Sequence, residues 1–134
     1  KLYSINRMSL SYMNKKAVIA TDFISWNGSV EYFTDSDFIF VESNHDLELL
    51  RQYFNPNSRF HMPNLKTGQM LCEIRRKSRK PPKTVMLGHL SSQRNEPHIA
   101  LAETRKAFGD AGIQLDFELY AAPRLEPSAE IKIA

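Results

Sequence analysis

Asp22, the polar stretch 42–46 and His89 each come directly after a short apolar run that is typical of a buried strand. In layered α/β folds, sites form beyond the carboxyl ends of parallel strands, so these residues are expected to converge on one crevice. Carboxylates and imidazoles together are the ligands of divalent metals such as zinc or manganese. The alternative interpretation is that Asp22 and Asn44 only cap turns or helices, and that His89 is an ordinary loop histidine.

The other histidines and the cysteine add little to such a site. The histidines stand at positions 45, 61, 89 and 98, and no His-x-His pair occurs. We expect His61 and His98 to be structural or exposed, so the sequence does not supply a complete metal site. The single cysteine, Cys72, excludes an intrachain disulfide and a cysteine-based zinc cluster. It suits a reducing compartment, and we expect a cytoplasmic protein.

Predicted strands and predicted helices alternate along the chain and must position these residues. This alternation predicts an α/β fold. Asn44 is expected to cap the helix that follows the second apolar run, and Gly109 is expected to end the last helix. The predicted strands are 17–20, 38–41, 84–87 and 114–121, with a weak first strand at 8–13 and an edge strand at 130–133, and the predicted helices are 28–33, 46–53, 68–79 and 97–108.

Length and composition fit a single globular domain over residues 1–134. The chain has 42% apolar and 25% charged residues, and no apolar run approaches the roughly 20 residues that span a bilayer. Its net charge of +3 includes six positive charges within residues 75–83, so the remainder is slightly acidic. This basic stretch is either a phosphate-backbone contact or a solvated helix end followed by a Pro-Pro turn, and the lack of interleaved aromatic residues favours the second interpretation.

Several motifs resemble the metallo-β-lactamase-fold superfamily, most closely its YycJ-like bacterial branch of exonucleases and phosphodiesterases. The resemblance covers residues 9–128 and corresponds to the C-terminal half of a four-layer αββα sandwich, in which helices flank a mixed sheet. The motifs that carry it are Ala20-Thr21-Asp22, Val41-Glu42-Ser43-Asn44-His45-Asp46 and Leu87-Gly88-His89-Leu90-Ser91, followed by Asn95 and Pro97.

The resemblance implies that Asp22 and His89 are metal ligands and take part in catalysis. Asp22 matches the carboxylate that bridges two zinc or manganese ions, and His89 matches the last histidine ligand. Asn44, His45 and Asp46 match an element beside the site that binds substrate or supports the loop. If Asp22 and His89 share a metal, their donor atoms should lie roughly 3–4 Å apart, and up to about 7 Å apart without the metal.

Two elements of the family are not found in the sequence. The His-x-His-x-Asp-His motif, which supplies most of the ligands, is expected to lie outside this chain. The Gly-His-Leu-Ser-Asn element is missing, and residues 65–69 stand near its place.

The resulting hypothesis is a metal-dependent hydrolase of phosphodiester bonds, nuclease-like, with two divalent metal ions in the complete protein. The expected partners are the missing N-terminal half or a second chain packed on the sheet, and a nucleic-acid or other phosphodiester substrate, with no membrane. The alternatives are a non-catalytic binding or structural protein that retains the fold, and a nucleic-acid-binding module that uses residues 75–83.

Overall fold

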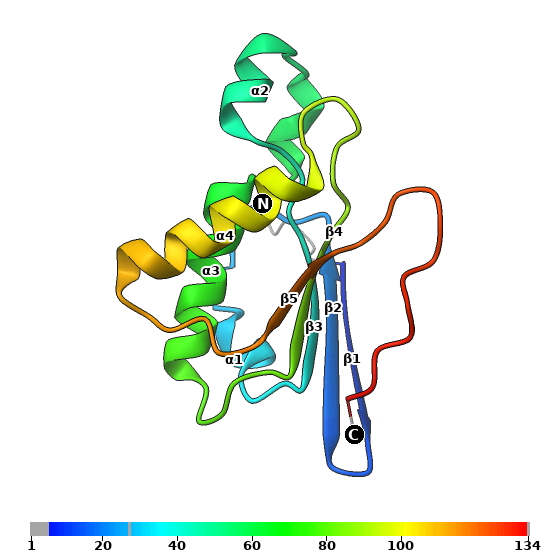
Figure 1. The fold of residues 1–134 in the computed structure, drawn as a ribbon, viewed down its shortest axis with the longest axis vertical. Helices are drawn as coiled ribbons and strands as arrows, with labels where there is room; N and C mark the ends of the chain where they lie inside the picture. The colour runs from blue at the N-terminus through cyan, green and yellow to red at the C-terminus, as the bar shows by residue number, and fades with distance from the viewer. Residues whose placement is uncertain (1–5, 27, 134) are drawn as a thin grey trace.

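A single mixed sheet of five strands organises the protein (Figure 1). The structure is a computed structural model and describes residues 6–26 and 28–133. The strand order follows the chain, with β1 antiparallel to β2 and all later neighbours parallel, which confirms the predicted α/β class with a mixed sheet. The strands are β1 (Asn6–Tyr12), β2 (Lys15–Thr21), β3 (Phe38–Glu42), β4 (Thr84–Gly88) and β5 (Glu118–Ala121).

Helices cover one face of this sheet, and a small helical lobe projects beyond one end of it (Figure 1). The covering helices are α1 (Val30–Phe33), α3 (Asn64–Lys77) and α4 (Pro97–Ala111). The lobe consists of α2 (Leu47–Gln52) and the 3-10 turn η1 (Pro56–Phe60), which together follow β3. The lobe therefore stands beside the carboxyl ends of the parallel strands, where the sequence predicts the site.

The core lies between the sheet and the covering helices. Val18 in β2, Val41 in β3 and Leu87 in β4 are fully buried because every second residue of these strands faces the helices. On the helical side, Met70 in α3 and Phe108 in α4 complete the same apolar cluster.

The opposite face of the sheet carries its own apolar row. Cross-strand partners lie on the same side of a sheet, and the register joins one residue from each strand. Part of this row is exposed: Met8 retains 48% of its accessible surface and Tyr120 retains 45%. The row is Met8, Ile19, Phe40, Met86 and Tyr120.

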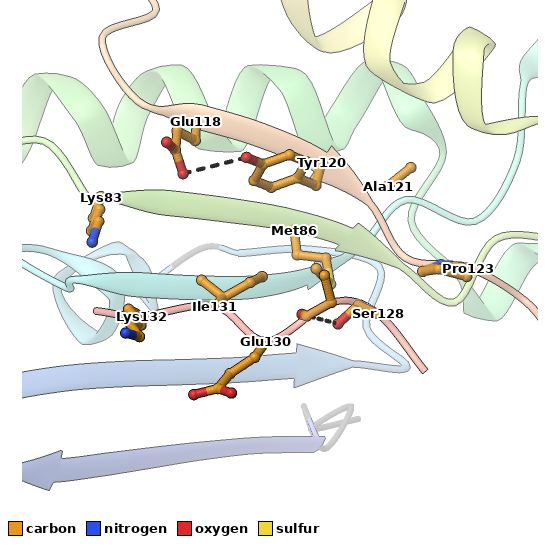
Figure 2. Close-up of a pocket in the computed structure, with 11 residues that line it drawn as sticks. Lys83, Met86, Glu118, Tyr120, Ala121, Pro123, Ser128, Glu130, Ile131 and Lys132 are labelled. Carbon is orange, nitrogen blue, oxygen red and sulfur yellow. Dashed lines mark hydrogen bonds between the residues drawn. The ribbon is translucent and has the colours of Figure 1, made fainter. Parts of the chain in front are cut away.

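The C-terminal residues 122–133 run across this second face without forming a strand (Figure 2). They leave a pocket of about 390 Å³ that is lined by Met86 and Tyr120 from the sheet and by Ile131 from the tail. The predicted edge strand at 130–133 is therefore wrong, because this segment packs against the face of the sheet and not along its edge.

Several predicted boundaries also shift. The cap of α2 is Asp46, whose side chain accepts a hydrogen bond from the Leu49 amide at 2.9 Å, so the predicted capping role of Asn44 is wrong. Helix α4 continues past Gly109 to Gly112, which adopts the left-handed conformation (φ 67°) that favours glycine at a helix end. The last strand is shorter than residues 114–121, and α3 begins earlier than residue 68.

The basic stretch 75–83 is engaged in structural ion pairs at the end of the sheet away from the lobe. Arg75 donates two hydrogen bonds to Asp116, at 2.9 and 2.7 Å, and these bonds lower the pKa of the Asp116 carboxyl. Arg79 pairs with Asp35, and Lys80 pairs with Asp37 just before β3. These contacts favour the structural interpretation of this stretch over the nucleic-acid module.

No helix within residues 6–26 and 28–133 is long and apolar enough to cross a bilayer.

The contact between α3 and α4 gives a direct test of this packing. A Cβ atom added at Gly68 would lie 2.8 Å from the Ala107 Cβ, whereas one added at Gly109 meets nothing within 4 Å. Replacing glycine by alanine gains similar helix propensity at both sites, up to about 1 kcal/mol. We expect Gly109→Ala to stabilise the protein and Gly68→Ala to destabilise it by about 1–3 kcal/mol through overpacking. Urea unfolding of the two variants measures the difference, and equal stability would contradict the close approach.

Candidate metal centre

Four side chains converge beyond the carboxyl ends of the central parallel strands. Each offers a possible metal-binding atom, and these atoms all lie within 4.8 Å of one another. Three of the residues end or directly follow β2, β3 and β4, and the fourth follows η1. The cluster is Asp22, Glu42, His61 and His89.

Glu42 is the centre of this cluster. Its side chain is fully buried, and its Oε1 lies 2.7 Å from His61 Nδ1 and 2.6 Å from His89 Nδ1. Its Oε2 accepts a hydrogen bond from the Asp22 backbone N–H at 2.9 Å. An ionised carboxylate can only accept hydrogen bonds, so both imidazoles donate to it through Nδ1. One buried carboxylate thus fixes both rings and the Asp22 backbone.

The Asp22 carboxylate lies next to both imidazoles at longer distances. Its Oδ1 is 3.6 Å from His61 Nδ1 and 3.4 Å from His89 Nδ1. The shorter separations from Glu42 are those of hydrogen bonds. Because each Nδ1 donates to Glu42, Nε2 is the ring atom of each histidine that is left to bind a metal.

The chemistry of the donor set also fits a divalent metal. Two imidazoles and a half-exposed carboxylate suit zinc or manganese, and a buried carboxylate behind the histidines is a common support for metal ligands. Asp22 and His61 retain 43% and 27% of their side-chain exposure, so the cluster is reachable from solvent.

The backbone at two of these residues is unusual. Asp22 (φ 55°) and His89 (φ 54°) both adopt the left-handed conformation, which residues other than glycine enter at a cost on the order of 1–2 kcal/mol. Each is the first residue after its strand, so the conformation turns the chain where the side chain enters the cluster. Such strained positions concentrate at functional sites.

A buried polar network supports the cluster from behind. The Ser43 hydroxyl donates to Asn64 Oδ1 at 2.6 Å, and the side-chain amides of Asn64 and Asn95 donate to each other at 2.9 Å. The Thr67 hydroxyl donates to the Glu42 backbone carbonyl at 2.7 Å. These bonds fix the end of β3 against the starts of α3 and α4.

The residues predicted to lie beside the site form the link between its two histidine loops. The Asn44 side-chain amide donates to the His89 carbonyl at 2.8 Å, and the Asn64 amide donates to the His45 carbonyl at 2.8 Å. Asp46 instead caps α2 and is not one of the four cluster residues.

His45 is buried and lies outside the four-residue cluster. Burial lowers the pKa of its imidazole, the neighbouring His61 and Arg94 lower it further, and Asp46 opposes this effect. These influences favour the neutral form of His45.

Sequence reasoning placed Asp22 and His89 at one edge of the sheet, and the structure brings them together there, with Asp22 Oδ1 3.4 Å from His89 Nδ1. The prediction that His61 is structural or exposed is wrong, because His61 belongs to the cluster. The missed signal is the spacing of His61 and Asn64, which equals that of the histidine and asparagine in the Gly-His-Leu-Ser-Asn pattern sought at 65–69. Glu42 was seen only as part of a polar stretch. His98, by contrast, is exposed and pairs with Glu96.

Comparison with known proteins identifies the fold. No protein-family model and no curated protein matches the sequence. Among solved structures, the chain is similar to the metallo-β-lactamase fold protein YhfI from Bacillus subtilis, with a TM-score of 0.61 and 17% sequence identity. The match covers 87% of this chain and 40% of YhfI, so the chain spans less than half the length of that protein. The chain therefore forms part of a metallo-β-lactamase fold.

Metal binding by this cluster can be measured directly. Replacing a residue that hydrogen-bonds a metal ligand typically lowers metal affinity by roughly 10–100-fold. Replacing a ligand itself should lower the affinity more. We expect His61→Ala to weaken zinc or manganese binding by more than 100-fold, and Glu42→Gln to weaken it by about 10–100-fold. Isothermal titration calorimetry gives the affinity and stoichiometry, with His98→Ala as the matched control. Unchanged binding in His61→Ala would exclude this residue as a ligand.

Proposed function

We propose that this protein is a metal-dependent hydrolase that acts on phosphodiesters, with Asp22, His61 and His89 as metal ligands. The observation that carries the proposal is the convergence of donor atoms from Asp22, His61 and His89 on the buried Glu42 carboxylate. The metallo-β-lactamase fold of the neighbouring structure supports it, because that fold is expected to hold divalent metal at this edge of the sheet.

When bound, the metal supplies a Lewis acid and an activated water for attack on an ester. The residues of this chain prepare that chemistry. Glu42 holds both imidazoles in the orientation set by their Nδ1 hydrogen bonds, and Asp22 adds a negative charge that offsets that of the metal. A substrate oxygen can approach from the solvent side, where Asp22, His61 and His89 are accessible.

The charges near the cluster support an anionic substrate. Arg59, Lys66 and Arg94 line the pockets that also contain His61, and no Asp or Glu lines those pockets. Within the described residues, none of these three cations forms an ion pair. A phosphodiester carries one negative charge and is attracted to such a surface.

Finer assignments belong to the same proposal. We propose that the chain is the C-terminal part of a YycJ-like protein, and that a His-x-His-x-Asp-His motif outside it completes a site for two metal ions. A cytoplasmic location stays a prediction.

The second face of the sheet is the proposed contact for the rest of the protein. The apolar row from Met8 to Tyr120 crosses all five strands, and Leu10 beside it is 54% exposed. Exposed apolar patches of this kind usually mark an interface. We propose that a second sheet layer, from the N-terminal part of the same protein, covers the part of this row that residues 122–133 leave exposed.

A charge placed on this face tests the proposal. Burying a carboxylate under a second layer should destabilise the full-length protein by several kcal/mol, whereas an exposed substitution stays within about 0.5 kcal/mol. We expect Leu10→Asp to lower the free energy of unfolding by more than about 2 kcal/mol. Tyr53→Asp, at a position that is also 54% exposed, serves as the control. Equal, small effects in the two variants would mean that the face is open.

The hydrolase activity is tested with bis(p-nitrophenyl) phosphate and the full-length, metal-loaded protein. We expect Asp22→Asn to reduce kcat/KM by about 10³-fold, since the substitution removes a charged ligand of the metal. Asp110→Asn, which alters a carboxylate with 67% exposure on α4, should have no effect. A metal-loaded wild-type protein without activity on any phosphodiester would favour the non-catalytic alternative.

A further inference from the structure

Two pockets of different character flank His61. The first has a volume of about 480 Å³ and the second about 250 Å³. They share Asn55, Ser58 and His61, so η1 forms the ridge between them. The second pocket is also lined by His89 and therefore reaches both histidines of the cluster.

The larger pocket, here called the apolar groove, has mostly apolar walls. Leu47, Leu50 and Phe54 come from the lobe, and Leu65 comes from the first turn of α3. Phe54 retains 78% of its accessible surface, and Leu47 and Leu65 each retain 42%. Leaving such side chains uncovered beside a polar cluster has a solvation cost, and apolar ligand atoms would relieve it.

The smaller pocket, here called the polar pocket, contains mainly amide and hydroxyl groups. Asn44, Asn57, Ser91 and Ser92 line it together with Arg94, and Leu90 is its one aliphatic residue. Such groups exchange hydrogen bonds with hydroxyls and do not favour an alkyl chain.

From this asymmetry we infer the substrate class of the proposed hydrolase, an inference that rests on the proposed function. The substrate is a phosphodiester with one apolar ester group and one hydroxyl-bearing polar ester group. The phosphoryl group lies at the cluster beside His61, the apolar group lies in the apolar groove, and the polar group lies in the polar pocket. Arg59 and Lys66 at the groove, and Arg94 at the polar pocket, attract the anionic centre.

The walls of the apolar groove favour an alkyl group over a nucleobase. Sites for single-stranded nucleic acid stack successive bases on several aromatic rings along a cationic track. Phe54 is the one phenyl ring that lines the apolar groove beside the imidazoles of His45 and His61, and its apolar walls are otherwise aliphatic or proline. A nucleic-acid strand is therefore the competing outcome of the test.

Binding of n-alkylphosphonates to the full-length, zinc-loaded protein tests the inference without relying on turnover. Their phosphonate head carries the anionic charge, and their C–P bond is not hydrolysed. Burying a methylene group strengthens binding severalfold, so we expect the affinity to rise on the order of 100-fold from methylphosphonate to hexylphosphonate. Phe54→Ser and Leu65→Ser should each flatten this dependence on chain length. Tyr53→Ser, at the neighbouring exposed residue that does not line the apolar groove, should leave it unchanged.

The outcomes separate this inference from the proposed function. If phosphonate binding is independent of chain length while phosphodiesterase activity is retained, the inferred apolar ester group is wrong, and the proposed hydrolase function stands. An oligothymidylate that binds more tightly than hexylphosphonate and displaces it would overturn the inference in favour of nucleic acid. Failure of every phosphonate to bind, together with no phosphodiesterase activity, would remove the proposed function itself.

Discussion

The burial of one carboxylate, that of Glu42, is the constraint on which the rest of the site depends. Removing an ionised carboxylate from water costs several kcal/mol unless hydrogen-bond donors surround it. Here two imidazoles and one backbone N–H provide those donors. The parallel order of β2, β3 and β4 places Glu42 between Asp22 and His89, so the sheet topology itself assembles the cluster.

The surrounding hydrogen bonds hold this arrangement in place. Residues 44–46 form backbone hydrogen bonds with both histidine loops: the Asn44 amide donates to the Met62 carbonyl, and the Asp46 amide donates to the Arg94 carbonyl. The left-handed backbone at Asp22 and His89 is maintained by the same packing. A site built in this way is preorganised, so binding of a metal requires little rearrangement.

Much of the fold and part of the site could be predicted from the sequence. The apolar runs at β2, β3 and β4 located the central strands, and the polar residues after them located Asp22 and His89. His61 was missed because it follows a 3-10 turn and has no strand before it to indicate its place. The segment 130–133 was misassigned because its alternating pattern fits a strand edge and equally a chain lying on an apolar sheet face. Only the three-dimensional arrangement shows that both Nδ1 atoms meet one oxygen of Glu42.

Crystallographic anomalous scattering at the zinc edge, on the full-length protein grown with zinc, tests the central claim most directly. The account predicts an anomalous peak within about 2.0–2.2 Å of one donor atom from each of Asp22, His61 and His89, with Glu42 hydrogen-bonded behind the rings. A peak elsewhere, with His61 and His89 still donating to Glu42 and no metal beside them, would contradict the account.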